Sequence, residues 1–291
     1  MNTNEQLRQQ IRNDYAGIAS ATSESVATTG SCCAGACGVT ETIDANELAE
    51  KIGYTKDELE ALPADANMGL SCGNPTIIAN LKEGETILDL GSGGGFDIFL
   101  AGPKVGKTGK AIGIDMTPQM IDKARANIDH YTKTTGLTNV EFRLGEIEHL
   151  PVPDASVDVI ISNCVLNLSM DKQQVWNEIS RVLKPGGRVA ISDIALLSEV
   201  PSEIKEILEA WAGCVAGAIP IEDMRQQMVN AGMDNLTLTP KPHYVDALTA
   251  ANDPLYAKVT ALLPEGQTAA DVITSVDILA TKPCGCASGC C

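Results

Sequence analysis

The feature that most constrains this chain is ILDLGSGGG, residues 87–95, where a short apolar run ends in a glycine-rich turn. Glycine adopts positive φ without a Cβ penalty and lets a backbone approach a ligand closely, which is typical of nucleotide-binding α/β domains. A second acid, Asp115, follows the next apolar run, 22 residues beyond Gly93, close to the spacing at which a carboxylate meets a ribose hydroxyl. Together they predict an adenosine-type site at the carboxyl ends of parallel strands.

From residue 85 onward, apolar runs alternate with amphipathic segments, which indicates βαβ units and a largely parallel sheet. We therefore predict an α/β fold with a doubly wound sheet. Strands are expected at 86–90, 110–114, 139–143, 157–162 and 188–193, with closing strands at 235–239 and 272–282. Helices are expected at 118–136, from about Asp171 to the KPGG turn, at 202–219 and at 221–232.

The chain is predicted to divide into four parts. Residues 1–66 would hold a polar first helix, a small-residue cysteine loop and two short helices that stop before Pro63. Residues 67–200 would form the nucleotide-binding core, 201–283 a smaller C-terminal lobe and 284–291 a cysteine-rich tail.

Composition narrows the classes of partner. The net charge is -17, from 38 acidic and 21 basic residues, and the basic residues form no block, so nucleic acid and anionic membranes are not expected to bind. No apolar run approaches the roughly 18 residues of a membrane span, and the start is polar where a secretion signal would be hydrophobic. We expect a cytoplasmic protein.

The ten cysteines are unevenly placed. Three lie within residues 32–37 and four within 284–291, while Cys72, Cys164 and Cys214 stand alone. In a reducing compartment such clusters indicate soft-metal or redox chemistry more often than permanent cross-links.

The identity of the nucleotide follows from what the glycine turn lacks. Phe96 occupies the position of the third glycine of a dinucleotide fingerprint, and the P-loop lysine is absent. An acid in the preceding strand, Asp89, suits a cationic ligand better than a pyrophosphate. S-adenosylmethionine, which carries sulfonium and ammonium charges, is therefore favoured.

Each lone cysteine could be a packed core residue or a ligand in a pocket. Cys164 could be a small core residue, but the end of a parallel strand is where ligands bind. The small apolar residues around Cys214 predict that it packs on a helix face. Cys72 lies in a Gly-Asn-Pro turn, which is typical of a surface or pocket edge. The three histidines lack ligand spacing, so no structural metal is predicted.

Several motifs resemble the arsenite S-adenosylmethionine methyltransferase family, from about residue 44 to 239. The resemblance implies a class I (Rossmann-like) methyltransferase fold. The motifs are ILDLGSGGGFD, GIDMTP, FRLGEIEHLPVPDASVDVIISNCVLNLS and RVLKPGGRVAISDI, together with the cysteine motifs GLSCGNP, SNCVLNL and AGCVAGA.

The resemblance also assigns site residues. Cys72, Cys164 and Cys214 would bind arsenic, the last being supplied by the C-terminal lobe. A more N-terminal cysteine would pair with Cys72 during turnover; Cys32 or Cys33 is favoured, with Cys37 in competition. The implied cofactor contacts are Asp89, Gly91, Ser92, Gly93, Asp115, Met116, Glu146, Ile147 and Asn163.

The chemistry agrees with these residue types. Trivalent arsenic is soft, so three thiolates can bind it and leave its lone pair free to attack a methyl group. The substrates would be arsenite and methylated arsenicals, in arsenic detoxification, with a thiol reductant such as glutathione or thioredoxin as partner.

Two alternatives remain open from sequence. One is a methyltransferase of a quinone or another small metabolite, since residues 145–163 resemble those families too. The other is a metalloid-binding or redox-sensing thiol protein, which the terminal cysteine clusters favour. The tail could capture arsenite or have no catalytic role.

Overall fold

The computed structural model describes residues 3–20, 45–63, 66–207, 211, 214–250 and 253–284. Cys32, Cys33, Cys37 and the tail from residue 285 lie outside the described residues, so the predictions for them stay predictions.

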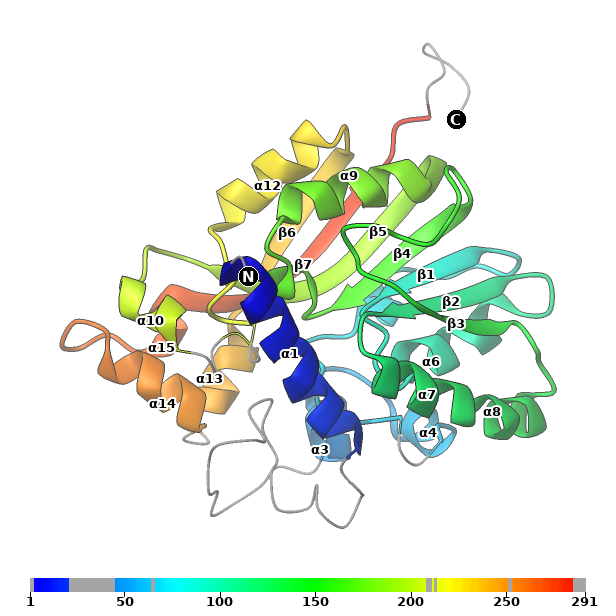
Figure 1. Cartoon of the computed structure of the whole chain (residues 1–291), viewed down its shortest axis with the longest axis horizontal. Coiled ribbons are helices and arrows are strands. Elements are labelled where there is room, and N and C mark those ends of the chain that lie inside the picture. Colours follow the sequence, from blue (N-terminus) through cyan, green and yellow to red (C-terminus); the bar gives the residue numbers. More distant parts are fainter. Residues whose placement is uncertain are drawn as a thin grey trace.

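The fold is built on a seven-stranded sheet with the order β3-β2-β1-β4-β5-β7-β6 (Figure 1). The first five strands are parallel, whereas β7 is antiparallel to β5 and β6 is antiparallel to β7. The strands are β1 Thr86–Leu90, β2 Lys110–Asp115, β3 Val140–Leu144, β4 Val157–Asn163, β5 Leu183–Leu196, β6 Asp234–Lys241 and β7 Ile273–Thr281. All seven predicted strands are confirmed, although β5 begins earlier than expected because Leu183 pairs with Val157.

The helices flank this sheet and form an N-terminal extension. Thr55 begins α4 with a capping box closed by Glu58, and Asp171 caps α9 by accepting from Gln174 N at 3.0 Å. The helices are α1 Thr3–Ser20, α3 Ala45–Lys51, α4 Lys56–Glu60, α5 Pro75–Ile78, α6 Phe96–Val105, α7 Pro118–Ala126, α8 Ile128–Thr135, the 3-10 helix η1 Leu166–Leu168, α9 Lys172–Val182, α10 Ser202–Glu206, α12 Ile221–Asn230, α13 Pro242–Ala250, α14 Pro254–Ala261 and α15 Ala269–Val272.

Two helix predictions need correction. The helix expected at 118–136 is divided at Asn127 into α7 and α8. The single helix expected at 202–219 is wrong, because α10 ends at Glu206 and Cys214 lies in a turn with φ 60°. Gly217 packs so closely on the Asn167 carbonyl that this tertiary contact overrides the apolar helical pattern.

Strand periodicity places the cores on both faces of the sheet. Leu88 and Ile160 pack with α9 and α12, whereas the alternate residues Ile87 and Val159 pack with Val105 of α6. The prediction of a doubly wound α/β sheet is therefore confirmed.

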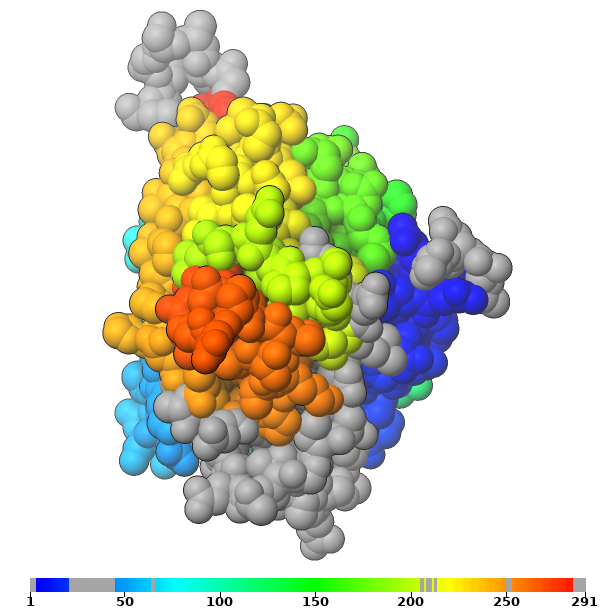
Figure 2. All heavy atoms as spheres, turned by 90° about the vertical axis from the view of Figure 1, so that its left-hand side faces the viewer, coloured from blue at the N-terminus to red at the C-terminus, as the bar shows by residue number. Residues whose placement is uncertain are grey.

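A further core fills the C-terminal part of the molecule. It joins residues of α13, α14 and α15 to the end of β5 and includes Cys72 and Cys214. Figure 2 shows the C-terminal segments, yellow to orange, making up much of one face. None of the helices in the described ranges combines the length and apolar character needed to cross a bilayer.

Candidate active site

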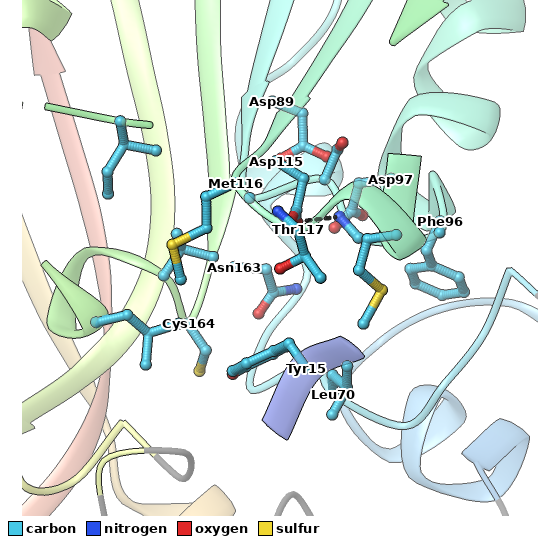
Figure 3. Close-up of a pocket in the computed structure, with 18 of the residues that line it drawn as sticks. Tyr15, Leu70, Asp89, Phe96, Asp97, Asp115, Met116, Thr117, Asn163 and Cys164 are labelled. Carbon is cyan, nitrogen blue, oxygen red and sulfur yellow. Dashed lines mark hydrogen bonds between the residues drawn. The ribbon is translucent and has the colours of Figure 1, made fainter. Parts of the chain in front are cut away.

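A pocket opens at the carboxyl ends of β1, β2 and β4, where Asp89, Asp97 and Asp115 gather near Asn163 and Cys164 (Figure 3). This is the edge of the sheet at which the sequence predicted a ligand. The predicted site residues that line the pocket are Asp89, Gly91, Ser92, Gly93, Asp115, Met116, Ile147, Asn163 and Cys164.

The glycine turn forms one wall of this pocket. Gly91 has φ 70°, and a Cβ there would overlap the side chain of Val165, the neighbour of Cys164. Gly95, with φ 93°, is the N-cap of α6. Ser92 donates its backbone N–H to Ile114 O at 2.9 Å, but its buried Oγ has no hydrogen-bond partner among the described residues. A polar ligand can satisfy that hydroxyl.

Asp115 locks the turn to the end of β2. Its carboxylate accepts from Gly93 N at 3.0 Å and from Thr117 N at 2.8 Å. Burial raises the pKa of Asp115, although these two hydrogen bonds oppose the shift. The 22-residue spacing seen in the sequence therefore corresponds to a direct contact.

Asp97, which the sequence analysis did not assign to the site, joins the acids. It lies in the first turn of α6, is 5% exposed and accepts from Tyr54 Oη at 2.7 Å. Burial raises the pKa of Asp97 to about 6. Burial, Asp97 and Asp115 together raise the pKa of Asp89 well above its ordinary range. No ion pair within the described residues neutralises these three acids, so the pocket suits a cation.

Asn163 connects the pocket to the first cysteine turn. Its Nδ2 donates to Gly73 O at 2.7 Å, and its Oδ1 accepts from Cys72 N at 2.9 Å. The end of β4 therefore holds residue 72 in place, although 91 positions separate the two residues.

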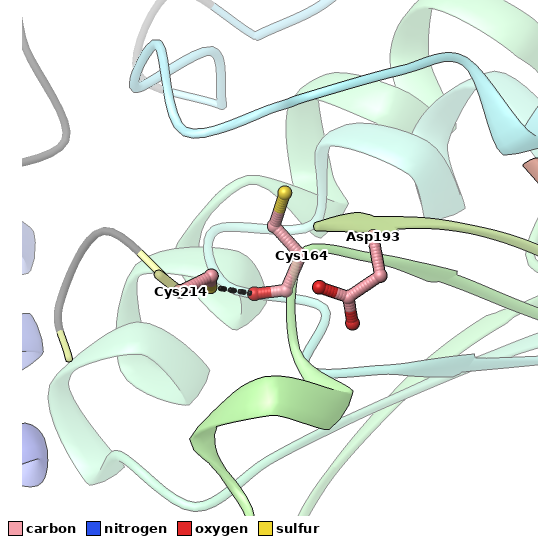
Figure 4. A group of neighbouring side chains, drawn as sticks. All are labelled: Cys164, Asp193 and Cys214. Atoms are coloured by element: carbon pink, nitrogen blue, oxygen red, sulfur yellow. Dashed lines mark hydrogen bonds between the residues drawn. The ribbon is translucent and has the colours of Figure 1, made fainter. Parts of the chain in front are cut away.

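The three lone cysteines converge beside the pocket. Cys72 and Cys164 form a disulfide with their Cα atoms 6.2 Å apart. Cys164 Sγ, Cys214 Sγ and a carboxylate oxygen of Asp193 all lie within 4.8 Å of one another (Figure 4). The Cys214 thiol donates to Cys164 O at 2.7 Å. Three segments far apart in sequence thus bring their sulfur atoms together.

The backbone at two of these cysteines is unusual. Cys164 has φ 57° and Cys214 has φ 60°, in the left-handed region that non-glycine residues rarely occupy. Each such conformation costs about 1 kcal/mol, so the surrounding structure must hold it.

Helix α1 supplies two contacts that sequence reasoning missed. Arg8 and Tyr15 line the pocket, and nothing in the polar opening segment signals that role. Glu146 is not among the lining residues; its carboxylate lies 2.9 Å from Arg12 Nη2, and the neighbouring Glu148 lines the pocket instead.

A family model described as a methyltransferase domain matches residues 81–245, more than half of the chain and the part that carries the pocket. The chain belongs to this methyltransferase family. The match, together with the seven-stranded sheet, confirms the predicted class I methyltransferase fold.

More specific relatives are arsenite methyltransferases. The chain is 44% identical to that of Halobacterium salinarum over 237 residues, 81% of this chain and 60% of that protein. It is 37% identical to that of Mus musculus over 177 residues, 59% of this chain and 46% of the mouse protein. The chain thus matches 60% or less of the length of these curated relatives.

A solved structure agrees with this relationship. The arsenic(III) S-adenosylmethionine methyltransferase of Chlamydomonas reinhardtii superposes with a TM-score of 0.60 at 29% identity, covering 84% of this chain and 76% of that one. The resemblance drawn from the sequence motifs is confirmed.

Proposed function

We propose that this methyltransferase transfers methyl groups from S-adenosylmethionine to trivalent arsenic bound by Cys72, Cys164 and Cys214. The observation that carries the proposal is the convergence of these three residues next to an acidic pocket. The names of the similar proteins, which are arsenite methyltransferases, point the same way.

The pocket fits this cofactor on its own features. When bound, S-adenosylmethionine supplies an electrophilic methyl group on a positively charged sulfur. The buried Ser92 Oγ offers an unused hydroxyl, and the backbone of Gly93 lines the pocket without a side chain to cover it. Asp89 and Asp97 would attract the positive charges and Asp115 would hold the ribose.

The cysteines would bind the substrate only after reduction. Two electrons and two protons from a thiol pair convert the Cys72–Cys164 disulfide into two thiols. Arsenite then exchanges its three hydroxyls for three cysteine sulfurs and releases three waters. Arsenic retains its lone pair, which is the nucleophile, so the chain needs no general base for the transfer. Its task is to position the sulfurs and exclude water.

The cycle closes through further redox chemistry. Methylation oxidises arsenic formally by two electrons, and a cysteine pair can return those electrons by forming a disulfide. Cys32 or Cys33 remains our predicted partner of Cys72 for that step. We place the reaction in the cytoplasm, where glutathione or thioredoxin can reduce the disulfide, and assign it to arsenic detoxification.

The test is methyl transfer by the purified, reduced chain. Arsenite, glutathione and methyl-labelled S-adenosylmethionine are supplied to wild type and to Cys72→Ser, Cys164→Ser and Cys214→Ser. We expect labelled methylarsenicals from wild type and a loss of about 100-fold or more in each variant, with cofactor affinity unchanged. Cys284→Ser is the matched control, because that exposed residue lies against Gly186, outside the cluster.

Each outcome has a distinct meaning. Absence of label from the arsenic products of wild type would contradict the function. Full activity of both Cys164→Ser and Cys214→Ser would overturn the three-sulfur site and leave the enzyme class intact.

The cysteine cluster also favours one function of another class. A buried disulfide beside a further thiol would serve a metalloid-binding or redox-sensing protein. Stoichiometric arsenite binding without labelled product would support that function instead.

A further inference from the structure

We propose that Asp193 is a positioning residue that sets the relative placement of Cys164 and Cys214. The inference rests on the proposed function and adds a residue outside the predicted ligand set. Asp193 lies on β5, beside Cys164 and on the opposite side from Cys214 in Figure 4, and is fully buried.

The Asp193 carboxylate ties the turn after Cys164 to the sheet. It accepts from Leu166 N at 2.9 Å, from Asn167 Nδ2 at 3.0 Å and from Ile194 N at 2.8 Å. Hydrogen bonds to an ionised carboxylate are stronger than those between neutral groups. The η1 turn, which begins two residues after Cys164, is thereby fixed to β5.

Asn167 extends this connection toward Cys214. Its side chain is fully buried and also donates to Ile194 O at 2.6 Å. A Cβ at Gly217 would overlap the Asn167 carbonyl, so the two backbones are in close contact. Gly217 follows Cys214 by three residues, so the path from Asp193 through Asn167 reaches the turn that carries the third sulfur.

The two cysteine turns need such support. Both cysteines have left-handed backbones, which persist only where neighbouring structure determines them. Cys164 N donates to Ser192 O at 2.8 Å, so the residue before Asp193 anchors Cys164 directly. The Cys214 thiol in turn contacts Cys164 O. One segment of β5 therefore supports both turns.

The surroundings of Asp193 require a carboxylate. Its two oxygens face three N–H donors, so an amide would turn its own NH2 group toward one of them. Those donors already occupy the Asp193 oxygens, and soft arsenic prefers sulfur to oxygen, so Asp193 lies within 4.8 Å of both sulfurs as a support and not as a ligand.

The experiment compares Asp193→Asn with Glu178→Gln. Glu178 serves as the control because it is also buried and accepts from a loop backbone, Leu150 N at 2.7 Å, as well as from Arg181, away from the cysteines. For Asp193→Asn we expect arsenite affinity and kcat/KM for arsenite to fall about tenfold or more, as for a lost hydrogen bond to a charged group. S-adenosylmethionine affinity should stay within about twofold of wild type.

A second readout does not depend on arsenic. Reduced protein is treated with glutathione disulfide, and formation of the Cys72–Cys164 bond is followed by mass spectrometry. Misplacement of Cys164 in Asp193→Asn should slow this step by about tenfold, whereas Glu178→Gln should match wild type. If wild type fails to methylate arsenite, the proposed function fails, and this readout still decides the role of Asp193.

Two results would overturn the inference. One is equal loss of arsenite and cofactor binding in Asp193→Asn, which indicates general destabilisation. The other is wild-type behaviour in both readouts. If Asp193→Asn does not fold, Asn167→Ser, which removes the same Nδ2 donor from the other side, takes its place with the same expected pattern.

Discussion

The cofactor end and the cysteine end of the pocket are built in different ways. The cofactor end comes from neighbouring segments, the β1 turn and the end of β2, joined by the hydrogen bonds of Asp115. The cysteine end comes from turns at residues 72, 164 and 214, which only the completed sheet and C-terminal core bring together. The first end is local in sequence, whereas the second is a product of topology.

The two ends of the pocket also differ in which residues have a positive φ. Positive φ at the cofactor end falls on glycines such as Gly91 and Gly95, which adopt it without strain. At the cysteine end it falls on Cys164 and Cys214. The cysteine end should therefore be more sensitive to changes in residues that never touch a ligand.

The largest effect is expected from a substitution at the contact between the cofactor end and the cysteine end of the pocket. Gly91→Ala would push the cofactor turn against Val165, beside Cys164. We expect cofactor affinity to fall about 100-fold, as for an overpacked core, and arsenite affinity to fall with it. Both are measured by calorimetry, with circular dichroism to verify folding.

Gly136→Ala is the control for that variant. Its φ is also 70°, but a Cβ there meets nothing within 4 Å. It should cost stability without weakening either ligand. Loss of cofactor affinity alone in Gly91→Ala would show that the two ends are independent.

Asp115→Ala should affect only the cofactor end. The two backbone donors at Gly93 and Thr117 lose a charged acceptor, so cofactor affinity should fall about 30-fold. Arsenite binding to the reduced protein should not change. Asp171→Ala, which removes a comparable side-chain acceptor of a backbone N–H at the start of α9, should leave both affinities intact.

The acids of the cofactor end predict a pH dependence. Burial raises the pKa of Asp97 to about 6, so between its ordinary value and 6 the folded protein binds more protons than the unfolded chain. The stability of the ligand-free protein should fall as pH rises through that window. A cation prefers ionised Asp97, so cofactor affinity should rise in the same range.

Thermal melts and calorimetry from about pH 4 to about pH 8 measure both trends, which should level off above the window. Asp97→Asn should flatten each of them and weaken the cofactor at neutral pH. Unchanged slopes in Asp97→Asn would assign the dependence to other groups, such as Asp89.

The smallest effect is expected on α1, which contributes Arg8 and Tyr15 to the pocket lining. Arg12 and Glu146 are partly exposed, and such pairs contribute little. Arg12→Ala should weaken the cofactor by about twofold, and the difference should shrink in high salt. Arg225→Ala, which removes the exposed pair with Glu222 on α12, should have no effect on binding.

The sequence predicted what depends on local pattern. Alternating apolar runs located all seven strands, and the spacing from Gly93 to Asp115 became a hydrogen bond. Asp97 was missed because an acid in a first helical turn also reads as a complement to the helix dipole.

The features of the site that the sequence did not predict depend on contacts between distant segments. Cys214 was expected on a helix because its neighbours are small and apolar, whereas the contact of Gly217 with Asn167 imposes a turn. Tyr15 and Arg8 reach the pocket only because α1 packs across it, and no periodicity within α1 encodes that position.

The Cys72–Cys164 bond closes a covalent loop that contains all of β1, β2, β3 and β4, with a separation of 92 residues. In the chain-entropy model such a loop restricts the unfolded chain and stabilises the protein by about 4 to 5 kcal/mol. Reduction, which the proposed arsenic binding requires, also removes that restriction. Under the proposed function the reduced form is therefore the less stable one, and arsenic bound by both cysteines would restore the restriction.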